Sequence, residues 1–561
     1  MRSSPPLLVR NALVLDGVRD EPEVGDVRIG NGHVAEVGRS LTPGEDEEVV
    51  DGDGLALAPG FLDMHSHSDL YTLVRDEPDA APLGDRPKLL QGVTTQVFGQ
   101  DGISAAPLRD DDLEAYGRYI TGLNGFLEPK HWTWREFGDY LAALRATSST
   151  RVAGLVGHST VRRLVMQMQA RPPSERELDL MRDAVDTALR QGAIGLSTGL
   201  VYAPAAYADT EELVALCEVV ARHGGRLFIH VRSESDKVLE ATEEALEVAR
   251  RTGVHLHYSH IKTAGKTNWH RAERMLEMID DYRRHGVAVT TDVHPYTAGS
   301  TTANVLLPPW VMEGGMDVTL VRLADPAVRE RLYRQVTEDT TTWDNWWAFS
   351  GGWQGLWLSG VAPGSRNEHL RGRSMQDIIL EAGVTDPLSP WGFDVIWDLL
   401  IAERLQVSLI SFNNVETNVA KFMAQPYCSI GSDALVNATG SPHPRLYGTF
   451  PRVLGRFVRE LGTLSLPAAV NAMTARAADV LGRPKLGRIV PGAPADLVLF
   501  NPATIIDRAT YEEPRRPPVG VHRVLVAGRT VVRDGELTSH SAAAPGDESA
   551  PPAAEEPPAE T

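Results

Sequence analysis

The sequence contains few of the features that mark secreted, membrane-spanning or nucleic-acid-binding proteins. Its two cysteines, Cys217 and Cys428, are too few for a disulfide framework and fit a reducing compartment. No apolar run approaches the ~20 residues that span a bilayer, and the N-terminus lacks the apolar core and cleavage pattern of a signal peptide. The net charge of −20 argues against a nucleic-acid surface. We therefore expect a cytoplasmic protein with neither a nucleic-acid nor a membrane partner.

Short β-branched runs alternate with amphipathic helical segments through the middle of the chain. Helices are predicted at 211–223 and 235–252, between strand candidates. This alternation favours a parallel sheet, and eight strands fit an α/β fold of the (β/α)8 TIM-like barrel type. The strand candidates are 61–65, 94–99, 152–157, 194–197, 227–231, 256–261, 287–293 and 428–433.

The remaining segments predict a division into parts. Residues 1–55 and 485–537 contain short strand signals and are each too short for a good core, so we expect them to pair in one small β-sandwich. The barrel would take 56–484, with a lid-like insertion at about 310–425 between strands seven and eight. The acidic, low-complexity residues 541–561 are expected to be disordered.

The insertion is rich in tryptophan, and two interpretations of this remain open. The side chains could form an apolar wall for a hydrophobic group of a ligand, or they could make the insertion's own small core. The second interpretation is favoured, because large aromatic side chains usually pack together. The tryptophans concerned are Trp343, Trp346, Trp347, Trp353 and Trp357.

The segment PGFLDMHSHSD, residues 59–69, carries the clearest chemical signal. His65 and His67 stand two residues apart after a strand signal, so their side chains point to the same face and can reach one metal ion. Three other predicted strands end in His230, His260 and Asp433. Each alone fits a hydrogen-bonded core residue or a helix cap. Together, at the strand ends where barrel enzymes build their sites, they predict a divalent metal, with zinc favoured.

Motif content and order resemble the amidohydrolase superfamily, and within it the N-acyl-D-amino-acid deacylases (D-aminoacylases). The matching stretches run from about residue 10 to 535 and include PGFLDMHSHSD, GVTTQVFGQDGIS, FIHVRSES, YSHIKTAGKTNW and GSDALVNATGSPHPR. The resemblance implies the barrel, the β-sandwich from both termini and a mobile insertion. It also implies that His65, His67 and Asp433 hold one metal position, while His230 and His260 hold the tighter one.

One motif departs from that family. Its members usually carry Gly-Asn-Cys-Gly after strand two, and the Cys serves both metal positions, whereas this sequence has Gly99-Gln100-Asp101-Gly102. Asp101 matches the Cys position, and a carboxylate can bind or bridge metals. Without the thiolate, the preference for zinc broadens toward manganese, iron or cobalt. The competing interpretation is an Asx turn before Gly102. One metal ion or two both remain open.

These residues suggest an amide hydrolysis. A metal-bound water would attack the carbonyl, and Asp433 is the candidate general base. Arg445 can grip a substrate carboxylate bidentately, and the resemblance adds Lys262 and Tyr296 as carboxylate contacts. Further candidates for the substrate pocket are Arg232, two residues past His230, together with Ser300 and Tyr202.

The favoured function is hydrolysis of an N-acyl-D-amino acid or a related N-acylated small molecule. A first alternative is a cyclic-amide hydrolase of the dihydropyrimidinase or dihydroorotase kind, but those commonly carry a lysine at the end of strand four, where this chain has IGLSTG. A second alternative is a non-catalytic binding barrel with an altered metal site. The sequence leaves the acyl group, the side chain and a homo-oligomeric state open.

Overall fold

The computed structural model describes residues 6–77, 80–339, 341–437, 440–542 and 545. All eight predicted strands are present within them. They are β6 (Phe61–Asp63), β8 (Val93–Phe98), β9 (Arg151–Gly154) continued by β10 (Val156–Gly157), β11 (Gly195–Gly199), β12 (Arg226–His230), β13 (His255–Tyr258), β14 (Val289–Val293) and β18 (Cys428–Ile430).

Every pairing along this series is parallel. One sheet runs β6-β8-β9, and the next runs β10-β11-β12-β13-β14-β18. The first and last strands of the series also meet. Met64 N–H donates to the carbonyl of Ile430 at 3.3 Å, and Asp433 N–H donates to the carbonyl of His65 at 2.8 Å. Short strands β7 (Ser66–His67) and β19 (Ala434–Leu435) pair there in parallel.

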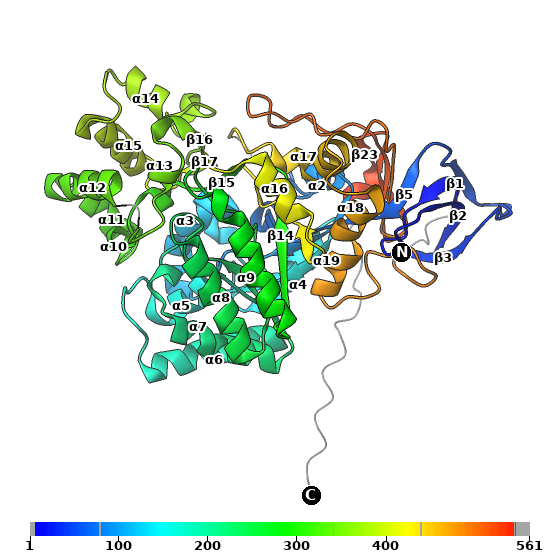
Figure 1. Ribbon diagram of the computed structural model, residues 1–561, viewed down its shortest axis with the longest axis horizontal. Helices are drawn as coiled ribbons and strands as arrows, with labels where there is room; N and C mark the ends of the chain where they lie inside the picture. The colour runs from blue at the N-terminus through cyan, green and yellow to red at the C-terminus, as the bar shows by residue number, and fades with distance from the viewer. Residues whose placement is uncertain (1–5, 78–79, 340, 438–439, 543–544, 546–561) are drawn as a thin grey trace, which may run out of the picture.

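Helices follow the strands. They are α3 (Leu113–Asn124), α4 (Phe137–Thr147), α5 (His158–Met166), α6 (Glu175–Arg190), α7 (Thr210–Arg222), α8 (Val238–Thr252) and α9 (Ala272–Arg284). The last five pack side by side in the lower part of Figure 1. The helix predicted from residue 235 begins only at Val238. The reason is tertiary, because Ser233 and Ser235 bind the side chain of Asp344 and are held outside the helix.

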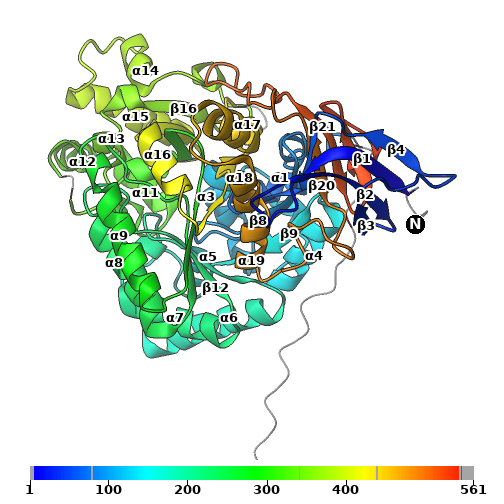
Figure 2. The ribbon, with the colours of Figure 1, turned by 45° about the vertical axis from the view of Figure 1, so that its right-hand side comes forward.

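The two ends of the chain contribute to one nine-stranded sheet, which lies at the right of Figures 1 and 2. Strand β5 of the N-terminal part pairs antiparallel with β20 of the C-terminal part. Its strands are β1 (Leu7–Val14), β2 (Glu23–Gly30), β3 (His33–Gly38), β4 (Glu48–Asp51), β5 (Ala56–Pro59), β20 (Leu497–Phe500), β21 (Val521–Val526), β22 (Arg529–Arg533) and β23 (Glu536–Leu537). Ser539–Ala542 then form a short 3₁₀ helix, and the predicted disordered tail beyond it lies outside the described residues, Pro545 excepted.

The long segment between β14 and β18 has secondary structure of its own. Strands β15 (Ala298–Thr302), β17 (Ser408–Phe412) and β16 (Leu356–Gly360) form an antiparallel sheet in that order. The helices around it are α10 (Pro309–Met312), α11 (Met316–Ala324), α12 (Pro326–Glu338), α13 (Trp346–Phe349), α14 (Met375–Glu381) and α15 (Pro390–Ala402). The segment ends with α16 (Glu416–Met423), and after β18 come α17 (Arg445–Arg452), α18 (Leu466–Met473) and α19 (Ala475–Val480).

Tryptophans of this segment pack mainly against one another. The ring of Trp353 lies 6.2 Å from Trp347, 6.2 Å from Trp397 and 4.8 Å from Phe393, measured between centroids. Trp353 and Trp397 are fully buried. The interpretation as the insertion's own core is therefore confirmed for this cluster. Trp346 differs, since it lines a cavity described below.

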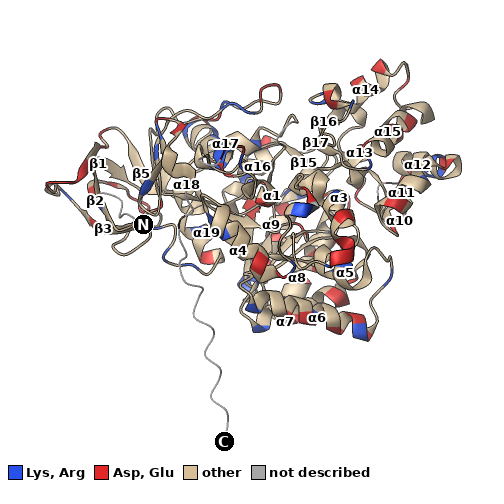
Figure 3. Cartoon of the chain, turned by 180° about the vertical axis from the view of Figure 1, so that it is seen from behind, with Lys and Arg blue, Asp and Glu red and all other residues tan. Residues whose placement is uncertain are grey.

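Charged side chains of both signs are spread over the outer helices and loops (Figure 3). Within the described part of the chain, no helix combines the length and the apolarity that a membrane crossing requires.

A buried ion pair joins the first strand of the series to the loop after the last. Lys88 Nζ, on α2 (Arg86–Leu89), lies 2.7 Å from Asp63 Oδ2 and donates to Ser432 Oγ at 2.6 Å. The Ser432 N–H donates to Asp63 Oδ1 at 2.7 Å. All three side chains are fully buried. Each charge is therefore compensated within a closed network.

We expect Lys88→Met to lower the free energy of unfolding by about 3–5 kcal/mol, because it leaves the Asp63 carboxylate buried without its cation. The double variant Lys88→Met/Asp63→Asn should recover much of this loss, since no charge then remains buried. Urea unfolding of the three proteins checks the prediction. Equal stability of the single and double variants would contradict it.

Candidate metal centre

Six acidic and imidazole side chains converge where the parallel strands end. His65 lies between β6 and β7, His67 ends β7, and His230 ends β12. The other three lie in the turns just after β8, β13 and β18, and their backbones all have positive φ: 55° at Asp101, 34° at His260 and 51° at Asp433. Such angles are costly for residues other than glycine and persist only where the surroundings enforce them. Each turn therefore redirects a side chain toward a common point.

The Gly-Gln-Asp-Gly turn shows how the sequence enforces this geometry. Gly99 and Gly102 both have φ of +77°. A Cβ at Gly99 would lie 2.1 Å from the carbonyl oxygen of Leu155, the residue between β9 and β10. Any other residue at Gly99 would push β8 away from its neighbour. Asp101 is thus held between two glycines that allow the chain to fold back tightly.

Asp101 stands at the centre of the group. Its Oδ1 lies 3.5 Å from His65 Nε2 and 3.3 Å from His260 Nε2. Its Oδ2 lies 3.4 Å from His67 Nε2 and 3.8 Å from His230 Nδ1. One carboxylate therefore faces all four imidazoles, and it is 3% exposed.

Asp433 completes the side of the group near His65 and His67. Its Oδ1 lies 3.7 Å from His65 Nε2 and 3.5 Å from His67 Nε2. Its Oδ2 faces the Arg445 guanidinium, with Nη1 at 2.8 Å. That pair is close but not aligned as a hydrogen bond, so Nη1 and Nε of the buried Arg445 retain free donors.

The donor set fits a divalent cation. His65, His67, Asp101 and Asp433 form one group whose ligand atoms lie within 4.8 Å of one another, and Asp101, His230 and His260 form a second. Both ring nitrogens of His230 and the Nδ1 atoms of His65 and His67 are buried and lack a hydrogen-bond partner in the protein. Buried imidazoles normally have partners. Nitrogen and oxygen ligands in two groups that share Asp101 suit one or two metal ions.

The pKa values describe the charge that this group holds without a metal. Burial would lower the pKa of His67, but hydrogen bonds to Asp101 and Asp433 raise it to about 9. Burial and Lys262 oppose protonation of His260, yet Asp101 and Glu234 raise its pKa to about 10. The pKa of Asp101 stays well below its usual range, because the surrounding imidazoles outweigh its burial. The carboxylates thus require positive charge beside them, which protons or a metal ion can supply.

Two further acids, not identified from the sequence as site residues, support the histidines. Glu234 Oε1 lies 3.1 Å from His260 Nδ1 and 2.5 Å from Lys262 Nζ. Asp292 Oδ2 accepts from His257 Nε2 at 2.9 Å, and its Oδ1 accepts the His260 N–H at 2.9 Å. Glu234, on the second ring nitrogen of His260, fixes the orientation of that imidazole. The local signal for Glu234 was only its position four residues after His230.

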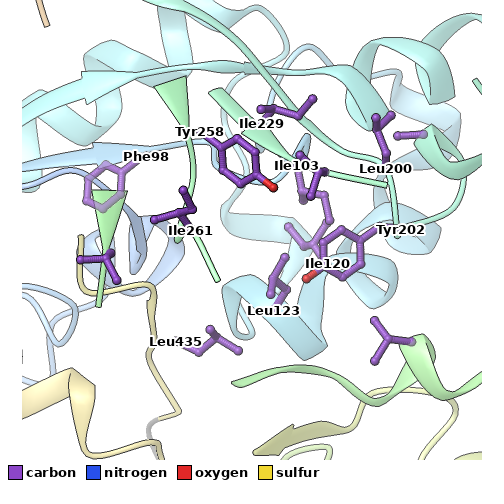
Figure 4. Close-up of a cluster of buried hydrophobic side chains, with 14 of the residues drawn as sticks. Phe98, Ile103, Ile120, Leu123, Leu200, Tyr202, Ile229, Tyr258, Ile261 and Leu435 are labelled. Carbon is purple, nitrogen blue, oxygen red and sulfur yellow. The ribbon is translucent and has the colours of Figure 1, made fainter. Parts of the chain in front are cut away.

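A cavity opens beside the group, and some of the predicted substrate residues line it. Including its open mouth, it has about 290 Å³ of free space. Tyr202, Lys262 and Ser300 lie in its wall, together with Trp346 and Asn413. Tyr202 Oη shares a hydrogen bond of 2.8 Å with Thr301 Oγ1. Its ring also belongs to the buried apolar cluster of Figure 4, which includes Ile120 and Leu123.

The other predicted substrate residues lie elsewhere or act indirectly. Arg445 meets Asp433, and its Nη2 donates to the carbonyl of Ser300 at 2.9 Å. Tyr296 Oη donates to Asp507 Oδ2 at 3.3 Å, and its side chain is not among those that line the cavity. Arg232 turns away to Glu244, with two bonds of 2.9 Å, and does not line the cavity either.

Asp344 fixes the long insertion to the loop after β12. Its Oδ1 accepts from Ser233 Oγ at 2.7 Å and from Ser235 Oγ at 2.5 Å, and its Oδ2 accepts the Glu234 N–H at 3.1 Å. Asp344 is buried. This contact places Trp346, two residues further on, in the cavity wall.

Comparison with known proteins adds a family and close relatives. A family model described as "Amidohydrolase family" matches residues 48–532. Three proteins of Alcaligenes xylosoxydans xylosoxydans are each 33% identical to this chain. The match to a D-aminoacylase covers 96% of both chains. The match to an N-acyl-D-aspartate deacylase covers 95% of this chain and 92% of the relative, and the match to an N-acyl-D-glutamate deacylase covers 95% of this chain and 94% of the relative.

Solved structures agree with this match. The N-acyl-D-glutamate deacylase of Bordetella bronchiseptica, complexed with zinc and a phosphonate inhibitor that mimics the tetrahedral intermediate, aligns with a TM-score of 0.76 at 32% identity, covering 94% of this chain and 96% of that one. A D-aminoacylase described by its binuclear metal centre aligns with a TM-score of 0.77 at 33% identity, covering 96% and 99%.

Proposed function

Because the chain belongs to the amidohydrolase family, we propose that it is a metal-dependent enzyme that hydrolyses the amide of an N-acyl-D-amino acid. The observation that carries the proposal is the buried group of four imidazoles and two carboxylates around Asp101. Full-length similarity to three deacylases of N-acyl-D-amino acids supports the substrate class.

The proposed architecture places this group at the mouth of a closed (β/α)8 barrel. The unbroken order of parallel strands and the hydrogen bonds between the ends of β6 and β18 support closure. We assign 56–484 to the barrel, with an inserted lid-like segment at about 310–425. We assign 1–55 with 485–537 to a small β-sandwich, supported by the pairing of β5 with β20.

The residues that would hold the metal are His65, His67, Asp101, His230, His260 and Asp433. A bound divalent ion makes water a stronger nucleophile at neutral pH and polarises the amide carbonyl. Zinc is the favoured ion. Manganese, iron or cobalt are further candidates, because Asp101 supplies an oxygen where a thiolate would select zinc.

The chain's own side chains supply the proton transfers and the orientation of the substrate. Asp433 accepts a proton from the attacking water and returns it to the nitrogen of the leaving amine. Arg445, 2.8 Å from Asp433 Oδ2, keeps that carboxylate ionised and in position, since its charge helps to hold the pKa of Asp433 well below the usual range despite burial. Lys262, in the cavity wall, is suited to hold the substrate carboxylate. Arg445 lies behind that wall, beside Asp433, and its Nε and Nη1, which make no hydrogen bond within the protein, make it a second candidate for this contact.

Two alternatives are weaker. A cyclic-amide hydrolase of the dihydropyrimidinase kind would be expected to carry a lysine at the end of strand four, but β11 is Gly-Leu-Ser-Thr-Gly. A non-catalytic binding barrel would not need a buried carboxylate such as Asp433 beside His65 and His67. A cytoplasmic location and a homo-oligomer both stay predictions.

A substrate panel tests the proposed function. We expect metal-loaded protein to release amine from N-acetyl-D-amino acids and to leave N-acetyl-L-amino acids, hydantoin and dihydrouracil intact. Zinc, manganese and cobalt should each be tried after removal of metal with a chelator. Hydrolysis of hydantoin with no release of D-amino acid would favour the cyclic-amide enzyme. If the protein binds no stoichiometric amount of metal and hydrolyses none of these compounds, the result would favour the binding barrel.

A further inference from the structure

The wall of the cavity also carries polar atoms without partners. They are Ser300 Oγ, Trp346 Nε1 and Asn413 Oδ1, in side chains that are 6%, 4% and 3% exposed. Asn413 Nδ2 donates to Ser411 Oγ at 3.0 Å, which leaves Oδ1 as the free atom. Buried polar groups without partners are costly and uncommon in native proteins. Three of them along one cavity indicate a ligand with matching polar groups.

These atoms flank the two cations that are suited to hold the substrate carboxylate. The carbonyl of Ser300 accepts from Arg445 Nη2 at 2.9 Å. The carbonyl of Asn413 accepts the N–H of Gly265, three residues past Lys262, at 2.7 Å. The carboxylate and the side chain of an amino acid are bonded to the same carbon. A substrate whose carboxylate lies at Lys262 and Arg445 therefore places its side chain against Ser300, Trp346 and Asn413.

The charges in this wall exclude an acidic side chain. Lys262 is the only lysine or arginine among the described residues that line the cavity, and Glu234 already holds its Nζ at 2.5 Å. Arg445 is likewise paired with Asp433. The first carboxylate of the substrate would take Lys262 and the remaining donors of Arg445, so a second substrate carboxylate would meet no further lysine or arginine in this lining and would lie near Asp101, Glu234 and Asp433. Burying an unpaired charge beside like charges is strongly unfavourable.

We propose, on the basis of the proposed function, that this enzyme selects D-amino acids whose neutral side chain both accepts and donates hydrogen bonds, as a carboxamide does, and discriminates against acidic ones. The Trp346 N–H donates to the carboxamide oxygen, and Asn413 Oδ1 accepts from its nitrogen. Ser300 Oγ can do either. The three relatives are equally similar to the chain, at 33% identity. Overall similarity therefore does not indicate which substrate side chain this enzyme prefers, and the preference is inferred from the residues of the cavity.

Rates for three substrates test the preference. We expect kcat/KM for N-acetyl-D-glutamine to exceed that for N-acetyl-D-glutamate by about 100-fold, because the acid brings an unpaired charge. It should exceed that for N-acetyl-D-leucine by about tenfold, because leucine leaves the polar atoms without partners. A rate for the glutamate derivative equal to or above that for the glutamine derivative overturns the proposal.

Variants that remove one hydrogen-bonding atom locate the effect. Trp346→Phe keeps an aromatic ring and removes the N–H, and Ser300→Ala removes the hydroxyl. Each should lower the ratio of the glutamine rate to the leucine rate by about fivefold to tenfold. Trp391→Phe is the matched control, since Trp391 is 72% exposed on α15 and should leave the ratio unchanged. An unchanged ratio in both cavity variants overturns the assignment.

Binding of the products separates this inference from the proposed function. Calorimetry with free D-glutamine and D-glutamate on the metal-loaded protein reports the side-chain preference without turnover. If no N-acyl-D-amino acid is hydrolysed, the proposed function fails, yet tighter binding of D-glutamine still supports the pocket. Tighter binding of D-glutamate overturns the pocket, whatever the enzyme hydrolyses.

Discussion

Asp433→Asn is expected to lower kcat by about 10²–10⁴-fold, the usual contribution of a positioned general base. The amide is almost the same size as the carboxylate and can stay between the N-terminal histidines and Arg445, but it cannot take a proton from water at neutral pH. Substrate still has Lys262 and Arg445 to bind, so KM should change much less than kcat. Steady-state rates with N-acetyl-D-amino acids, alongside metal content by mass spectrometry, make the measurement.

The control for this variant is Asp496→Asn. Asp496 is also a buried carboxylate that pairs with an arginine, Arg151, but it lies next to the terminal sheet and does not line the cavity. Its replacement should affect stability and leave kcat near the wild-type value. A near-normal kcat for Asp433→Asn, with metal retained, would remove Asp433 from the role of general base.

Asp101→Ala is expected to weaken the binding of divalent metal by more than about 100-fold. Loss of a residue that only hydrogen-bonds a metal ligand costs up to about 100-fold in affinity, and loss of a ligand itself should cost more. The carboxylate belongs to both candidate ligand groups, so one substitution removes a ligand from each. It also leaves four imidazoles close together without the negative charge that they face. Metal content after dialysis, and the shift of the thermal midpoint on adding a chelator, provide two independent measurements.

Asp101→Cys is the informative companion to the alanine variant. A thiolate at this position should restore metal binding and shift the preference toward zinc over manganese, since sulfur is a softer ligand than oxygen. Asp101→Asn keeps the shape of the side chain and removes its charge, and it should resemble alanine more than cysteine. Wild-type metal content in the alanine variant would show that Asp101 is only a turn residue.

The strands and the residues at their ends could be predicted from the sequence because both depend on local pattern. Alternation along a strand fixes the face of its side chains, and parallel strands bring their C-terminal ends to one edge. This reasoning placed His65, His67 and His230 together. It also succeeded for His260 and Asp433, although these lie just beyond their strands, in turns of positive φ. Asp101 was identified only because it matches the Cys position of the family motif.

Alternation no longer predicts the direction of a side chain where the chain leaves the strand. Arg232 was predicted to face the mouth because it follows His230 by two, but β12 ends at His230 and alternation no longer applies. Its guanidinium turns to Glu244 instead. Lys262 also lies beyond its strand, and it reaches the cavity because Glu234 holds it there.

Other features depend on contacts between distant parts of the chain. Asp344 binds residues about 110 positions earlier, and Tyr296 binds Asp507, 211 positions later. No local pattern in the sequence signals either contact. The role of Trp346 in the cavity wall follows from the first of them, so it could not be separated from the other tryptophans of the insertion until the fold was known.

The backbone angles at Asp101, His260 and Asp433 have a consequence for how this protein can evolve or be engineered. Substitution of any of the three by glycine would relax a turn that now costs free energy, of the order of 1 kcal/mol in each case. That gain is smaller than what glycine would remove, because the carboxylates of Asp101 and Asp433 face buried imidazoles whose charge would then be left without its partner. The strain in these turns is therefore retained together with the charged side chains, and a library screened only for stability would be expected to keep them.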